Sequence, residues 1–171
     1  MAIWVIAIVN FGLSKMSPIS IDLTPEHGKC LAVLVALWFQ QQFVFAIKVA
    51  LARHKYGIQP PTLYPRDSEI KEKQLTSDDV DSYMCTQRVH QNNVEFLVGF
   101  LPVMLVTMLP YPTETFYASL VVLVGRMTTA FGYYMGASKR TIGGFFHFGE
   151  YYLAYLAGKF AYQLITAEAT E

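Results

Sequence analysis

The chain has 171 residues, of which 53% are hydrophobic and only 15% are charged, and its formal net charge at pH 7 is +0. Soluble globular chains carry about 25% charged residues, so this composition indicates a membrane protein. The length allows one domain, and the lack of a basic excess excludes nucleic acid as a partner. Two cysteines, Cys30 and Cys85, are too few for a disulfide framework, and no metal-ligand spacing surrounds them, so we expect no metal.

The first apolar piece, residues 2–13, is too short to span a bilayer, which takes about 20 consecutive apolar residues. No basic stretch precedes it and no clean cleavage site of small residues follows it. We therefore expect a short helix in the membrane interface, or packed on the rest of the molecule, rather than a cleaved signal peptide. Residues 1–29 are predicted to form an N-terminal extension.

Four longer apolar stretches follow, at about residues 30–52, 89–109, 116–135 and 143–165, and each is long enough to cross a bilayer. The fourth is the weakest of these because it contains His147, Glu150 and Lys159. The sequence thus predicts an all-α integral membrane protein. Its core would be a four-transmembrane-helix bundle over residues 30–165, followed by a C-terminal tail, residues 166–171.

The connections between the stretches differ in charge. A long polar loop, residues 53–87, follows the first stretch, and a short link with Lys139 and Arg140 follows the third, whereas the turn at residues 110–112 has no Lys or Arg. With four spans, the first and third connections face the same side. The positive-inside rule places that side in the cytosol or its organellar equivalent, with both termini opposite.

Polar residues at the start of the second stretch form a pattern. Arg88, Asn92 and Glu95 stand at i, i+4 and i+7, so they share one helix face. Ionisable groups within a span are costly and usually face the bundle interior or a water-filled cavity. One interpretation of this face is an interhelical ion pair at the membrane edge, and the other is a ligand site.

The third stretch carries a similar face, with Arg126, Thr129 and Tyr133 at i, i+3 and i+7. Arg140 follows the end of this stretch, and Arg53 closes the first one. Several helices therefore bring an arginine to one membrane edge. Because guanidinium groups bind carboxylates in a bidentate manner, the pattern indicates a small anionic ligand that enters from the cytosolic edge.

Three segments of the chain resemble a known family. They are residues 45–56 (FAIKVALARHKY), residues 87–95 (QRVHQNNVE, with an R-x-x-x-N-x-x-E signature) and residues 125–140 (GRMTTAFGYYMGASKR). Their order and spacing resemble the membrane-associated proteins in eicosanoid and glutathione metabolism (MAPEG), and within that family a microsomal glutathione S-transferase. The similarity covers about residues 24–144.

The resemblance implies a four-helix protomer that assembles as a homotrimer in a lipid membrane, with glutathione as co-substrate between neighbouring protomers near the cytosolic face. The positions that match glutathione-holding residues are Arg53, Arg88, Asn92, Glu95 and Tyr133. We add Arg126 to this set because it shares the helix face of Tyr133. Arg140 matches, with a one-residue gap, the catalytic arginine that stabilises the thiolate. An adjacent cation lowers the pKa of a thiol, ordinarily about 8.5, and the thiolate would attack a hydrophobic electrophile or reduce a lipid hydroperoxide.

The chain also departs from the family pattern. Thr129 stands where the family often has a tyrosine, Val98 replaces a proline, and the loop before Arg88 is longer than usual. His147 and Glu150, at i and i+3, are interpreted as a buried polar pair or a protein contact rather than as a catalytic acid–base pair.

Two functional hypotheses follow. The first is a membrane glutathione transferase or peroxidase, and the second is a non-catalytic accessory subunit of a larger membrane complex built on the same fold. The extra N-terminal segment, the longer loop and the polar last helix favour the second hypothesis, whereas the retained polar positions favour the first. The expected membrane is the endoplasmic reticulum, with a mitochondrial membrane as the alternative.

Overall fold

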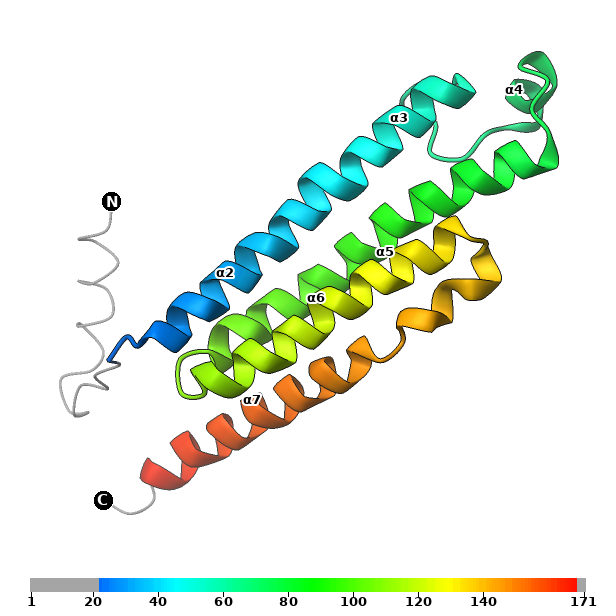
Figure 1. The fold of residues 1–171 in the computed structure, drawn as a ribbon. Helices are drawn as coiled ribbons and strands as arrows, with labels where there is room; N and C mark the ends of the chain where they lie inside the picture. Colours follow the sequence, from blue (N-terminus) through cyan, green and yellow to red (C-terminus); the bar gives the residue numbers. More distant parts are fainter. Residues whose placement is uncertain (1–21, 169–171) are drawn as a thin grey trace.

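The computed structural model describes residues 22–168, and the regular structure in this range is entirely helical. Four long helical segments lie side by side in alternating directions (Figure 1), the first of them made of α2, η1 and α3 in succession. The predicted segment at residues 2–13 lies outside the described residues. In chain order the elements are α2 (Pro25–Phe39), the π-helical turn η1 (Gln40–Phe45), α3 (Ala46–Tyr56), α4 (Asp67–Glu72), α5 (Ser77–Thr107), α6 (Pro112–Tyr134), the 3-10 helix η2 (Ala137–Gly143) and α7 (Phe146–Glu168).

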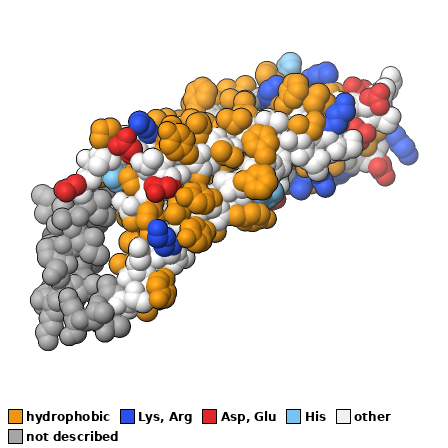
Figure 2. Space-filling view, turned by 60° about the horizontal axis from the view of Figure 1, so that its bottom comes forward, with side chains coloured by type: hydrophobic (Ala, Val, Ile, Leu, Met, Phe, Trp, Pro, Cys, Tyr) orange, Lys and Arg blue, Asp and Glu red, His pale blue; other side chains and the backbone are white. Residues whose placement is uncertain are grey.

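Within residues 22–168, two of the long segments, Pro25–Tyr56 and Pro112–Tyr134, are long and apolar enough to cross a membrane. That α5 and α7 also cross it stays a prediction, because both carry more polar residues. Hydrophobic side chains cover the middle of the molecule, and charged side chains gather at the end that holds α4 and, in smaller number, at the opposite end (Figure 2). This distribution is typical of a protein whose middle faces lipid.

The first and third connections lie at the same end of the molecule, and the turn between α5 and α6 lies at the other end (Figure 1). The predicted loop at residues 53–87 is shorter in the structure. It begins at Gly57, which ends α3 with a left-handed φ of 68°, and it stops at Thr76. There the Asp79 N–H donates to Thr76 Oγ1 (3.2 Å) and the Thr76 N–H donates to Asp79 Oδ2 (3.1 Å), so α5 begins far earlier than the apolar stretch.

The apolar core fills the half of the molecule nearest the α5–α6 turn. It is built from α2, α5, α6 and α7, and Leu37, Met104, Val122 and Leu153 in it are fully buried. Toward the opposite end, where η1 meets α5 and α6, the buried side chains become polar. This change of chemistry marks the site described next.

Candidate functional site

A buried chain of hydrogen bonds joins the first long segment to α5 and α6. Asn93 Nδ2 donates to Gln41 Oε1 (2.8 Å), and Asn93 Oδ1 accepts from Arg126 Nε (2.9 Å). A second donor of the same guanidinium, Arg126 Nη2, bonds Asn92 Oδ1 (2.9 Å). Buried polar groups are costly unless they are hydrogen-bonded, so these contacts fix the three elements in register.

The guanidinium of Arg126 packs against two aromatic rings that also contact each other. Its central carbon is 4.7 Å from the centroid of Phe96 and 5.0 Å from that of Phe146, and the residue is 4% exposed. Within residues 22–168, no carboxylate lies within 4.0 Å of it. Ring faces and amide oxygens therefore stabilise this buried cation without neutralising it, which leaves a positive potential for an anion.

A hollow of about 610 Å³ opens beside this arginine. The helix face of Arg88, Asn92 and Glu95 lines it from α5, as does the face of Arg126, Thr129 and Tyr133 from α6. The remaining lining residues are Phe96, Arg140, Thr141, Gly144, Phe146 and His147. Six of the seven predicted site residues thus surround one hollow, which we call the arginine pocket.

The charges of the arginine pocket are unbalanced. Arg88, Arg126 and Arg140 face it together with one carboxylate, that of Glu95. Among the described residues, Arg88 and Glu95 do not form an ion pair within 4.0 Å, so the ion-pair interpretation of this face is not realised within one chain. Such a set suits a small molecule with more carboxylates than amines.

Arg53 is the predicted site residue that the structure does not bring to this pocket within one chain. Its Nη1 donates to the carbonyl oxygens of Thr62 (2.8 Å) and Ile58 (3.5 Å). In this position Arg53 holds the connection that follows α3.

Arg140 reaches the pocket from η2, which packs unusually closely on α6. A Cβ on Gly132 would lie 2.3 Å from the carbonyl oxygen of Lys139, and one on Gly143 would lie 2.3 Å from that of Gly125. Only glycine allows this approach, which fixes the backbone around Arg140 while its side chain stays exposed. The same packing places Gly143 directly over Thr129.

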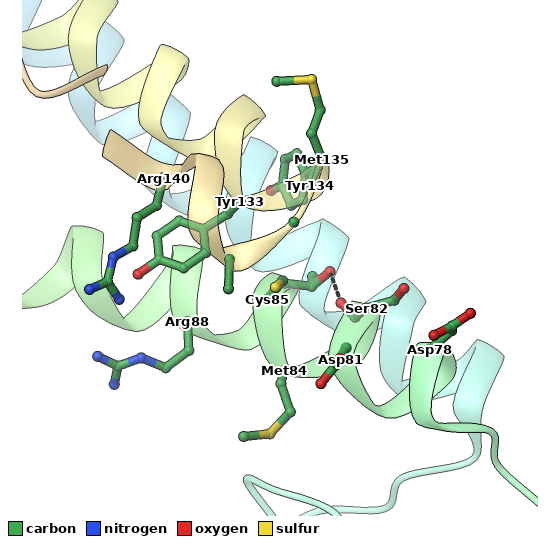
Figure 3. A pocket seen from close by; sticks show the side chains of 13 residues that line it. Asp78, Asp81, Ser82, Met84, Cys85, Arg88, Tyr133, Tyr134, Met135 and Arg140 are labelled. Carbon is green, nitrogen blue, oxygen red and sulfur yellow. Dashed lines mark hydrogen bonds between the residues drawn. The ribbon is translucent and has the colours of Figure 1, made fainter. Parts of the chain in front are cut away.

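A second hollow, of about 510 Å³, adjoins the first and shares Arg88, Tyr133 and Arg140 with it. Figure 3 shows the side chains of both arginines extending to the same side as the Tyr133 hydroxyl. Cys85 also lines this hollow, but burial and the nearby Asp81 raise the pKa of its thiol. Cys85 therefore does not supply a reactive thiolate at neutral pH.

The sequence did not single out several residues of the site. Asn93 holds Arg126 and is itself held by Gln41, and the signal for Gln41 was a run of three glutamines, residues 40–42, inside an apolar stretch. His147 and Glu150 do not form a buried pair within one chain, because their side chains are 49% and 36% exposed, and the alternative of a protein contact stays a prediction. His147 instead lines the arginine pocket.

Comparisons with known proteins agree with this geometry. The chain is 33% identical over 113 residues to an uncharacterized protein of Synechocystis sp., and the aligned part covers 66% of this chain and 72% of that protein. The MAPEG family model matches residues 31–162, which is most of the chain. This family is membrane-associated and includes glutathione transferases and related enzymes. The protein belongs to the MAPEG family.

Proposed function

We propose that this protein is a membrane-bound glutathione transferase and peroxidase, of the kind represented by microsomal glutathione S-transferase 3. The arginine pocket would bind glutathione and activate its thiolate for attack on hydrophobic electrophiles or lipid hydroperoxides. The observation that carries the proposal is the convergence of three guanidiniums and one carboxylate on one hollow beside apolar helices.

The chemistry of glutathione complements these groups. It has two carboxylates, one ammonium group and one thiol. Arg88 suits a carboxylate, the single carboxylate of Glu95 suits the ammonium group, and Tyr133 provides a hydroxyl donor. Arg126 acts chiefly by holding Asn92, since two of its donors are already used. Arg140, on the exposed side of the pocket, would stabilise the thiolate.

We further propose that the protein works as a homotrimer, in the endoplasmic reticulum or a mitochondrial membrane. Glu95 and Arg140 are exposed in the single chain, and Val98, one turn beyond Glu95 on α5, is 73% exposed. A neighbouring protomer on this side would close the pocket. It would also cover apolar surface that a lone chain leaves open.

The second candidate function is that of an accessory subunit in a larger membrane complex. The observation in its favour is the exposed face of α7, on which Tyr151, Tyr155 and Tyr162 are 66%, 62% and 69% exposed. Tyrosine is enriched at protein interfaces. Native mass spectrometry of the protein from its own membrane separates the two, because a homotrimer supports the enzyme and a large hetero-complex supports the subunit.

Calorimetry with glutathione tests the proposal directly. The wild type should bind, and Arg88→Ala should weaken binding by about 1.5–3 kcal/mol, or roughly 10-fold to 150-fold in Kd, because the charged hydrogen bond proposed between Arg88 and a glutathione carboxylate is lost. Arg66→Ala, at an exposed arginine before α4, is the matched control and should bind as the wild type does. Equal affinity of the wild type and Arg88→Ala would remove the binding role, and absence of binding by the wild type would favour the accessory subunit.

A further inference from the structure

A histidine–carboxylate pair stands at the rim of the arginine pocket. His147 Nδ1 lies 2.6 Å from Glu150 Oε2, one turn further along α7. The imidazole is also held by neighbouring rings, because its centroid is 4.0 Å from that of Phe146 and 5.6 Å from that of Tyr151. The ring is therefore oriented by three contacts although half of it is exposed.

The contact with Glu150 decides which ring nitrogen is available. An ionised carboxylate can only accept hydrogen bonds, so Nδ1 carries the proton in this contact. In the neutral imidazole, Nε2 then has the free lone pair and can take or return a proton. A carboxylate that fixes the tautomer of a histidine in this way is a recurring device in proton-transfer catalysis.

The groups around His147 come from every element that lines the pocket. They carry three positive charges and two negative charges, and two phenols lie among them. They are Arg88 and Glu95 from α5, Arg126 and Tyr133 from α6, Arg140 from η2, and Glu150 and Tyr151 from α7. Because Arg140 and His147 line the same hollow, a thiolate held by the arginine would lie in the hollow that His147 also lines.

We propose that His147 is a catalytic residue for the reduction of lipid hydroperoxides and that Glu150 is its positioning residue. This inference rests on the proposed function. The thiol of glutathione gives its proton to His147 Nε2. The thiolate then attacks the terminal peroxide oxygen, so an S–O bond forms while the O–O bond breaks, and the electron pair goes to the oxygen that stays on the lipid. The imidazolium protonates that oxygen, which leaves as the alcohol.

The redox balance closes with a second glutathione. The first step oxidises glutathione to its sulfenic acid and reduces the hydroperoxide to the alcohol. A second glutathione thiol then displaces water from the sulfenic acid to give the disulfide. His147 returns to its neutral form in each cycle, so no other oxidant or reductant is needed.

Two substrates with different leaving groups test the role of His147. An alkoxide is a poor leaving group and needs a proton in place, whereas chloride leaves a dinitro-substituted chlorobenzene without one. Arg140 would stabilise the thiolate in both reactions, so the two differ chiefly in whether the leaving group must be protonated. His147→Gln should therefore lower hydroperoxide turnover about 100-fold or more, in the usual range for a general acid, and lower turnover of the aryl chloride far less.

The variants are assayed as the full chain in lipid nanodiscs. Glu150→Gln should reduce hydroperoxide turnover to an intermediate level and alter its pH profile, while His147→Gln should remove one limb of that profile. His54→Gln, at an exposed histidine near the end of α3, is the matched control and should retain both activities.

The outcomes separate this inference from the function on which it rests. Selective loss of hydroperoxide turnover in His147→Gln supports the proton-transfer role. If the wild type turns over both substrates and His147→Gln changes them equally or not at all, the role is overturned while the proposed function stands. If the wild type turns over neither substrate, both proposals are overturned.

Discussion

The buried guanidinium of Arg126 gives the sharpest prediction for stability. Arg126→Met keeps most of the side-chain stem but removes two hydrogen bonds, to Asn92 and Asn93, each 2.9 Å long. Hydrogen bonds to charged groups contribute about 1.5–3 kcal/mol each, so the loss amounts to roughly 3–6 kcal/mol before the apolar methionine offsets part of it. A chain of this size loses about 2–4 °C of unfolding midpoint per kcal/mol, so we expect a midpoint lower by roughly 10 °C.

The assay is thermal unfolding of the purified protein in one detergent, with Arg66→Met as the matched control at an exposed arginine. Asn93→Leu and the double variant complete a cycle. Because Asn93 and Arg126 are partners, the double variant should lose less than the sum of the two single losses. A midpoint for Arg126→Met equal to that of the control, or full additivity in the cycle, would show that this network does not hold α5 to α6.

Three further predictions concern chemistry and topology. Arg140→Ala should lower glutathione turnover strongly while binding changes little, and the apparent thiol pKa, read from thiolate absorbance, should rise. Lys139→Ala is the control and should stay near the wild type. Equal, small effects of the two substitutions would remove Arg140 from the catalytic role. Cysteines placed at Ser68 and Thr113 should be labelled from opposite sides of the membrane, and labelling from one side would refute the four-span arrangement. Cys85 should be alkylated slowly at neutral pH and faster as the pH rises, because its raised pKa keeps the thiol protonated. Fast alkylation at pH 7 would contradict a raised pKa for this partly buried thiol.

The part of the site that could be predicted from the sequence is the part that follows helix periodicity. Arg88, Asn92 and Glu95 lie on one face of α5, as their spacing requires, and Arg126 and Tyr133 do the same on α6. The prediction that these two faces meet at one hollow followed from the helix directions, which bring the arginines to the same end of the molecule. Periodicity alone was enough because each set lies within a regular helix.

The start of α5, the packing of η2 and the position of His147 could not be derived from helix periodicity. Residues 77–87 have too few apolar positions to read as a helix, and their signal was the cap formed by Thr76 and Asp79. The close packing of η2 on α6 requires glycine at positions 132 and 143. The sequence alone does not show that the two backbones meet at these positions. The placement of His147 depends on where α7 begins after that contact, so its exposure and its position at the pocket could not be derived from its spacing to Glu150.

The π-helical turn η1 decides where the first long segment can change in length. Leu37, Gln41 and Phe45 are buried at a constant spacing of four, with Gln40 buried beside Gln41, whereas a regular α-helix alternates spacings of three and four. The turn therefore acts as one inserted residue that keeps a single stripe facing α5. Deleting one residue from the turn itself would restore an ordinary helix and leave the residues after it in the same orientation, whereas deleting one residue from α2 would rotate everything after the deletion by about 100°. The inward stripe of α3 would then turn away from α5, so this helix tolerates substitution far better than it tolerates a shift in register.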